Sequence, residues 1–487
     1  MTMIKIRLHI LIILLMVSTT ATVSAQNTDY IDFAVRRARM EPDMKHASLA
    51  VCVHDITHDS TIYALDANHA LLPAALNKLF TTAAGFSRLG SDFRFKTNLV
   101  YSGTIDNRGV LTGDIVILGN GDPFLGSTRI KGTMPDTLFR AITQAIRDEG
   151  IHRINGHIYA DASLFDDEMV HPTWQWNDIG NYYGSGISGL NYHENSINVR
   201  FSAGANVGDP ATITDIYPAN MALTLTNEVV TGPSDTASEI CFFGSPSANS
   251  RICRGVLAKG VRDTLIRASL PNPALCLADQ LTQYLRKHGV PVSGEASDRF
   301  EMPKRVHDLT TIQSLYYRDI AKLTNYTTNN MCAEGIFKYL GYYQDGVGNY
   351  TNSRRFMNLY FHELGLDVAG VKMVDGSGLS RDNHVTAKFL CQFLAAVAKE
   401  PYYEDYRNTL GISSQTGDSK VMKPKIPAGC KLVLKSGSMT SVKGYAGYFT
   451  NKNGNTYCFA IISNNYDCDN DTINVLLKNI IEEIAKL

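Results

Sequence analysis

The sequence predicts an α+β fold in which a helix-rich domain is interrupted by a long β-rich insertion. Its first part contains a β-hairpin pattern followed by a helical run that ends near Leu89. From Phe93 to about Val292, many short strand-like segments are separated by Gly and Pro, and only two clear helical segments occur, at 136–149 and 273–288. The rest of the chain returns to helical patterns, with two strands and an amphipathic helix at its end.

Length and composition are those of an ordinary globular protein that is large enough for two or three domains. The 487 residues include 46 Lys and Arg against 47 Asp and Glu. This near-neutral balance lacks the basic surface that nucleic-acid binding requires. A disordered, collagenous or coiled-coil protein is excluded because 44% of the residues are hydrophobic and only 19% are charged.

Residues 1–25 have the pattern of a secretory signal peptide. Lys5 and Arg7 precede an apolar run at 8–17, and small residues end the segment at Ala25. A run of about ten apolar residues is too short to span a bilayer, so a membrane anchor is the less favoured alternative. We therefore expect cleavage near Ala25 and an exported mature protein without a transmembrane segment.

The other expected elements follow from local patterns. Alternating apolar residues over 48–53 and 61–65, around a polar turn, predict a β-hairpin. Pro73 begins the next helical run, because proline fits the first turn of a helix. After the insertion, the apolar periodicity predicts helices at 311–323, 328–341, 350–364 and 385–399, strands at 431–437 and 456–463, and a C-terminal helix from Thr472.

Cysteine and histidine usage gives no sign of a metal centre. The nine cysteines are an odd number without metal-type spacing, so at least one thiol is expected to be free. Cys241 and Cys253 are the best candidates for a local disulfide, which export would permit. The thirteen histidines form no ligand pattern such as HExxH, and we expect neither a metal nor a cofactor.

Five strings provide the functional information. PAALNKLFTTAAGFSRLG (73–90), TNNMCAEGIFKYLG (328–341) and KSGSMTSVKGYAGYF (435–449) follow the order of the Ser-x-x-Lys, Ser-x-Asn and Lys-Thr-Gly motifs of the penicillin-recognising serine enzymes. Two further strings, LGNGDPFL (118–125) and VDGSGLSRDNHVTA (374–387), narrow the resemblance to one family among these enzymes. The whole mature chain resembles the D-alanyl-D-alanine carboxypeptidases/endopeptidases, the class C low-molecular-mass penicillin-binding proteins of peptidase family S13.

This resemblance implies a specific division of the chain. Residues 26–92 and 304–487 would form a β-lactamase/transpeptidase-like domain, which is an antiparallel sheet flanked by helices. Residues 93–303 would form the β-rich insertion, in two parts, between the first and second motifs.

The resemblance also assigns roles to individual residues. In the family, a Lys three residues after the nucleophile lies on the same helix face and takes the proton of the nucleophile hydroxyl. The matching residue here is Lys78. The alternative is that Lys78 is an ordinary Lys on a helix surface. The second-motif Asn, which holds the substrate backbone, is Asn330. The third-motif strand would face the substrate carboxylate with Lys435, Ser436, Gly437 and Ser438. The backbone N–H groups of Ala75 and Ser438 would form the oxyanion hole.

Two positions depart from the family pattern. Ala75 occupies the nucleophile position, and no Ser-x-x-Lys occurs anywhere in the chain. A methyl group cannot attack a carbonyl carbon. Thr328 replaces the second-motif Ser. A laboratory substitution would account for Ala75 but not for Thr328, so we favour a natural loss of the covalent chemistry.

Two charged residues and two tryptophans complete the candidates. Asp122 in the GDP turn and Arg381 after SGLS resemble a pair that holds the charged end of a stem-peptide side chain. The alternatives are a turn-forming Asp before Pro123 and a surface ion pair at Arg381. Trp174 and Trp176 are expected to pack within the insertion and not to bind glycan.

Two hypotheses about function follow. The first is a serine-type D-Ala-D-Ala carboxypeptidase/endopeptidase that acts on peptidoglycan stem peptides and is impaired by Ala75 and Thr328. The second is a pseudoenzyme that binds these D-Ala-D-Ala ends, or a partner in wall synthesis, without turnover. In the second case β-lactams would bind only non-covalently.

Overall fold

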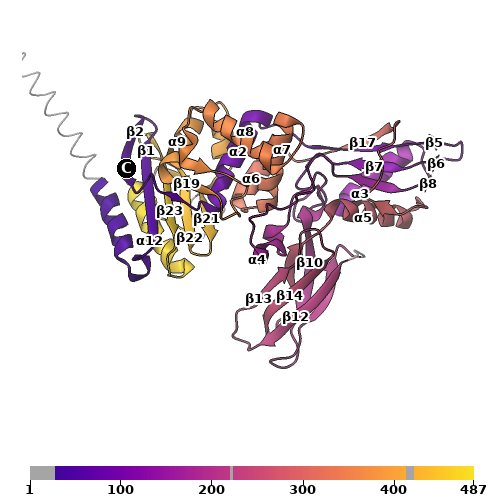
Figure 1. Ribbon diagram of the computed structural model, residues 1–487, viewed down its shortest axis with the longest axis horizontal. Coiled ribbons are helices and arrows are strands. Elements are labelled where there is room, and N and C mark those ends of the chain that lie inside the picture. Colours follow the sequence, from indigo (N-terminus) through magenta and orange to yellow (C-terminus); the bar gives the residue numbers. More distant parts are fainter. Residues whose placement is uncertain (1–27, 220–222, 413–421) are drawn as a thin grey trace, which may run out of the picture.

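The computed structural model describes residues 28–219, 223–412 and 422–487. The expected signal peptide, residues 1–25, lies outside this part of the chain. Figure 1 shows an elongated molecule, with a sheet and its covering helices at one end and the strands of the insertion at the other. Within the described residues, no helix combines the length and apolar character needed to cross a membrane.

The sheet of the helix-rich domain has six antiparallel strands in the order β2-β1-β23-β22-β21-β20. These strands are β1 (Ser48–Asp55), β2 (Ser60–Leu65), β20 (Gly411–Ile412), β21 (Lys431–Met439), β22 (Val442–Thr450) and β23 (Thr456–Asn464). The first two form the predicted hairpin, and both predicted late strands are confirmed. Because β1 also pairs with β23, where Val51 lies opposite Ile461, early and late parts of the chain share one sheet.

Helices cover both faces of this sheet. They are the N-terminal helix (28–40) and α12 (Asn470–Ile484) on one face, and α2 (Asn77–Leu89) and α9 (Ala387–Val397) on the other. Val51 of β1 belongs to the first core and Ala50 to the second. Alternate residues of a strand point to opposite faces, so a strand covered on both sides is apolar along its length. This explains the nearly continuous apolar run of β1.

Helix α2 lies at the centre of the helix-rich domain. It follows η2 (Ala74–Leu76) and packs against α6 (Tyr317–Tyr326), α7 (Asn330–Asp345), α8 (Tyr350–Glu363) and α10 (Tyr403–Arg407). The Phe80 ring makes edge contacts with Phe361 at 5.3 Å and Phe393 at 4.7 Å, between ring centroids. These contacts fix the helix that carries the first motif.

The helix predicted at 311–323 is partly wrong. Residues His307–Gln313 form strand β17, and α6 begins only at Tyr317. β17 pairs antiparallel with β4 (Lys96–Tyr101), so that His307 lies opposite Tyr101. The sheet of the insertion therefore extends past the boundary expected at 303. Sequence patterns missed this strand because its partner lies about 200 residues earlier in the chain.

The insertion has its own hydrophobic core and two parts (Figure 1). One part is a five-stranded sheet, β16-β9-β7-β4-β17, with helices on it: β7 (Ile115–Leu118), β9 (Ile158–Asp161), β16 (Ala296–Ser297), α3 (Pro135–Asp148) and α5 (Pro273–Lys287). The other part has two three-stranded sheets: β10 (Ser196–Ser202), β11 (Thr212–Tyr217), β15 (Thr264–Ser269), and β12 (Thr224–Gly232), β13 (Glu239–Phe243), β14 (Ser250–Ala258). Smaller sheets elsewhere are β5-β6-β8 (Thr104–Ile105, Val110–Thr112, Arg153–Asn155) and β18-β19-β3 (Val371–Lys372, His384–Thr386, Ala70–Leu71).

The expected disulfide between Cys241 and Cys253 is absent. All nine cysteines lie within the described residues, and none of them forms a disulfide there. In the pairing of β13 with β14, Cys241 lies opposite Arg254 and Cys253 lies opposite Phe242. Because neighbouring residues of a strand point to opposite faces, the two sulfur atoms lie on different faces of this sheet.

Candidate active site

A pocket of about 880 Å³ lies where the helix-rich domain meets the insertion. The residues predicted from sequence that line it are Ala75, Thr328, Asn330, Arg381 and Ser438. Lys78 and Lys435 are buried beside it, with side chains bonded to the second motif. The three motifs, which are far apart in the sequence, therefore meet at one place.

The first motif lies at the start of a helix. Pro73 precedes η2, which runs directly into α2. Ala74 has a φ of 48°, an uncommon conformation for a residue with a Cβ. Ala75 follows, 8% exposed at the pocket wall. The first N–H groups of a helix have no partner within it, so the Ala75 N–H is suited to donate to a ligand oxygen.

Lys78 is completely buried, which excludes the helix-surface alternative. Its Nζ donates to Oδ1 of Asn330 at 2.6 Å and to the carbonyl oxygen of Ser377 at 2.7 Å. The Nδ2 of Asn330 donates in turn to the carbonyl oxygen of Tyr183 at 2.7 Å, in the insertion. The first motif, the second motif and the insertion are thus joined by hydrogen bonds.

The second and third motifs face each other through Thr328 and Lys435. The Nζ of Lys435 donates to Oγ1 of Thr328 at 2.8 Å and to the carbonyl oxygen of Ser436 at 2.7 Å. Thr328 has a φ of 52°, which is rare for a β-branched residue. Asn329 begins α7, where its side chain accepts the Cys332 N–H at 3.0 Å. The strained backbone conformation of Thr328 is thus stabilised on one side by the Asn329 cap of α7 and on the other by the hydrogen bond from Lys435.

Strand β21 presents an open edge to the pocket. β20 pairs with it only at Val433 and Leu434, and no other described strand covers that edge from Lys435 onward. A Cβ at Gly437 would lie 2.5 Å from the Pro73 carbonyl oxygen, so glycine allows β21 to approach the start of η2. Ser438 is exposed on this edge. Such an edge can pair with an extended peptide.

A buried carboxylate, that of Glu334, helps to position Lys78. Glu334 was not predicted from the sequence. Glu334 on α7 accepts the N–H groups of Gly376 at 3.1 Å and Ser377 at 2.7 Å. These bonds fix the Ser377 carbonyl that holds Lys78. Burial and the nearby Asp375 raise the pKa of Glu334 to about 8. Glu334 and Ser377 lie inside recognised strings, but no sequence spacing indicates that they meet.

Trp174 connects the insertion to the helix-rich domain. It is 5% exposed, and its Nε1 donates to Oδ2 of Asp375 at 2.9 Å. Trp174 is therefore a buried packing residue that also bonds to the helix-rich domain, and this bond was not predicted from the sequence. Trp176 is 58% exposed, with its ring 6.4 Å from the Phe243 ring.

The structure does not bring Asp122 to the same place as Arg381. Asp122 is buried in its turn, where Oδ1 accepts the Phe124 N–H at 2.9 Å, and it does not line the pocket. Arg381 does line it, and its buried Nε has no hydrogen-bond partner among the described residues. The acid beside Arg381 is Asp178: burial raises the pKa of this carboxyl, and the Arg381 charge partly offsets the rise. The GDP turn is the more conspicuous pattern in the sequence, but in the structure it holds Asp122 away from the pocket.

A buried Asp122 gives a prediction about pH. Burial raises its pKa from 3.8 to about 6, so the folded state loses stability as the pH rises from about 4, where the unfolded chain ionises first, to about 6, above which the loss is constant. Asp122→Asn cannot ionise and keeps an oxygen for the Phe124 N–H. We expect the variant to be more stable than the natural chain at pH 7.5, by up to about 3 kcal/mol, and this difference to vanish near pH 3, where the carboxyl is protonated in both states. Urea unfolding at both pH values measures this; weaker peptide binding with unchanged stability would instead make Asp122 a ligand residue.

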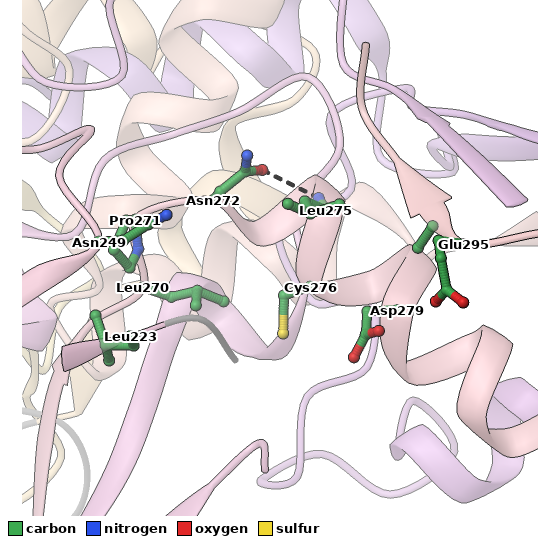
Figure 2. A pocket seen from close by; sticks show the side chains of 10 residues that line it. Leu223, Asn249, Leu270, Pro271, Asn272, Leu275, Cys276, Asp279 and Glu295 are labelled. Atoms are coloured by element: carbon green, nitrogen blue, oxygen red, sulfur yellow. Dashed lines mark hydrogen bonds between the residues drawn. The ribbon is translucent and has the colours of Figure 1, made fainter. Parts of the chain in front are cut away.

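A second, smaller pocket lies within the insertion (Figure 2). Its volume is about 240 Å³, and it lies beside α5, where the Asn272 side chain accepts the Leu275 N–H. Apolar side chains line it together with the carboxylates of Asp279 and Glu295. None of the residues predicted from the three motifs lies there, so the larger pocket is the candidate active site.

The antiparallel sheet, the central helix α2 that follows Ala75, and the meeting of the three motifs define a β-lactamase/transpeptidase-like fold. Comparison with solved structures supports this fold. Penicillin binding protein 4 (dacB) from Haemophilus influenzae superposes with a TM-score of 0.78 at 23% identity, covering 90% of this chain and 96% of that one.

The family is shown by sequence. The model of the D-Ala-D-Ala carboxypeptidase 3 (S13) family matches residues 33–485, and the chain belongs to this family. A D-alanyl-D-alanine carboxypeptidase from an Actinomadura species is 25% identical over 442 residues, covering 88% of this chain and 79% of that protein. The D-alanyl-D-alanine carboxypeptidase DacB of Haemophilus influenzae is 24% identical over 402 residues, covering 81% of each.

Proposed function

We propose that this protein binds the D-Ala-D-Ala ends of peptidoglycan stem peptides in its periplasmic pocket without turning them over. The observation that carries the proposal is Ala75 at the nucleophile position of an otherwise assembled pocket. We take the class of ligand, a D-Ala-D-Ala end, from the family to which the chain belongs. The protein would therefore be a catalytically impaired member that works by binding.

The pocket has groups for each part of such a ligand. The open edge of β21 would pair with the peptide backbone, with Ser438 near the terminal carboxylate and Lys435 behind it. The amides of Ala75 and Ser438 would hold the carbonyl oxygen. Arg381 and Asp178 would hold a side-chain end that has both a carboxylate and an amine.

The pocket lacks the nucleophile that formation of an acyl-enzyme requires. With no oxygen on residue 75, no ester can form with the penultimate D-Ala, and Lys78 has no hydroxyl proton to accept. Thr328 is a poor substitute because its Oγ1 is bonded to Lys435 and its methyl group limits rotation about χ1. Loss of the serine from a comparable hydrolase lowers turnover by on the order of 10⁶, which leaves only binding and the oxyanion hole.

Two measurements on the natural chain test the proposal. We expect a fluorescent penicillin to leave no label after denaturation, while a peptide ending in D-Ala-D-Ala binds saturably in fluorescence anisotropy. The same peptide ending in L-Ala-L-Ala is the ligand control, and Arg381→Gln should weaken binding. A label that survives denaturation would show that the chain is an active acyl-transfer enzyme.

A further inference from the structure

A second charged cluster lines the same pocket and is not used by the site described above. Arg129, Glu194 and Arg267, all from the insertion, lie on its wall. The Glu194 side chain is 3% exposed and accepts from Nε of Arg129 at 2.8 Å and from Oγ of Ser127 at 2.6 Å. Its other oxygen lies 3.9 Å from Nη2 of Arg267. One buried carboxylate thus holds two guanidinium groups.

The backbone around Glu194 is built to hold that carboxylate in place. His193, Glu194 and Asn195 have φ values of 54°, 53° and 46°, three consecutive residues in the left-handed region. Such conformations cost free energy and persist only where surrounding contacts enforce them. Here the contacts include the bond from Ser127 and the two arginines.

The cluster has a net charge of +1. Burial alone would raise the pKa of Glu194, but hydrogen bonds and charge from Arg129 hold it below its ordinary value, so Glu194 is ionised at neutral pH. Arg129 and Arg267 are cations, with 46% and 19% of their side chains exposed. Two cations against one anion leave an excess positive charge facing the pocket.

Both arginines keep N–H groups for a ligand. Arg129 uses Nε and Nη2 on Glu194, and among the described residues no acceptor is bonded to its Nη1. Arg267 donates from Nη2 to Oγ of Ser196 at 2.8 Å and lies over the Tyr182 ring at 4.8 Å. The stacked ring fixes the guanidinium plane without using its donors.

The cluster lies next to the second motif. The Nδ2 of Asn329, between Thr328 and Asn330, donates to Oε2 of Glu194 at 3.3 Å. Tyr182 precedes Tyr183, whose carbonyl accepts from Asn330. Arg381, in contrast, has Asp178 beside it and suits a group that is both acid and amine. The pocket therefore has two cationic positions with different chemistry.

We propose that Arg129 and Arg267 form a subsite for a carboxylate that projects from the ligand in addition to its C-terminal carboxylate. This inference rests on the proposed function and makes it more specific: the preferred ligand is an acidic stem peptide, not a bare D-Ala-D-Ala end. Guanidinium groups bind carboxylates through paired, charge-assisted hydrogen bonds. Loss of such bonds is expected to weaken binding about 10-fold to 100-fold.

The test compares two synthetic pentapeptides on the full chain by calorimetry. Both end in D-Ala-D-Ala and contain a γ-linked D-glutamyl residue, which bears a free α-carboxylate in one and a carboxamide in the other. We expect the acid to bind at least about 10-fold more tightly at low salt, and the preference to shrink as salt increases. Arg267→Gln should reduce the preference to within about 2-fold, while Arg140→Gln, an exposed arginine of α3 outside the pocket, should leave it unchanged.

Arg129→Lys is the second variant, because it keeps a charge beside Glu194 and endangers folding least. It should bind both peptides with a reduced preference for the acid. Equal affinity of the natural chain for acid and amide would overturn the subsite and leave the proposed function standing. Absence of binding to either peptide would overturn both. An unchanged preference in a folded Arg267→Gln variant, checked by its unfolding temperature, would also overturn the subsite.

Discussion

Replacing Ala75 with serine is expected to give a protein that is acylated by penicillin, whereas the natural chain is not. The new hydroxyl would lie one helical turn before Lys78, whose Nζ is already positioned by Asn330 and Ser377. Only the nucleophile would be added, and the second motif would keep Thr328 in place of its serine. The gain should approach the loss that removing such a serine causes in a hydrolase, on the order of 10⁶ in turnover. Fluorescent penicillin labelling after denaturation detects the acylation, and release of D-Ala from a D-Ala-D-Ala peptide measures the turnover.

The controls separate the nucleophile from its surroundings. Ala75→Ser combined with Lys78→Met should lose the label, because no base would remain to accept the serine proton. Ala75→Ser combined with Thr328→Ser should label at least as fast as Ala75→Ser, since it keeps the second-motif hydroxyl and removes the methyl group. If neither serine variant is acylated while both are folded, the pocket has lost more than its nucleophile.

Replacing Asp375 with alanine is expected to destabilise the protein by about 4 kcal/mol or more. Its Oδ1 accepts from the Gly378 amide and from Asn383 at 2.8 Å each. Its Oδ2 accepts from the Ser380 amide at 2.6 Å and from Trp174 at 2.9 Å. The side chain is fully buried, so alanine would leave these donors without partners. Urea unfolding measures the change.

The same loop provides a matched control. Asp382 is exposed, and Asp382→Ala should change the free energy of unfolding by less than about 0.5 kcal/mol. Asp375→Asn should lower the free energy of unfolding by an amount between those of the two alanine variants, because an amide has only one oxygen that can accept hydrogen bonds. A stable Asp375→Ala protein would mean that water replaces the carboxylate and that Trp174 does not tie the insertion to the helix-rich domain through this bond.

Local patterns predicted most elements of the helix-rich domain. Helices such as α8 and α12 were predicted because their buried residues recur at helical spacing. The hairpin of β1 and β2 was predicted because two short apolar runs flank a polar turn. Strand β17 was mistaken for a helix because its structure depends on β4, a partner far away in the chain. The same limit applies to the cysteines: the register of β13 and β14 places Cys241 and Cys253 on different faces, which spacing does not reveal.

The sequence by itself determined the family, the order of the three motifs and the absence of an oxygen at position 75, because these are properties of residue identity and order. Only the tertiary structure decided that Asp178, and not Asp122, lies beside Arg381, and that Arg129 and Arg267 share one buried carboxylate. Such groupings depend on how distant segments pack. The position of a charged side chain depends on its burial and on its interaction partners, and local sequence predicts neither of them.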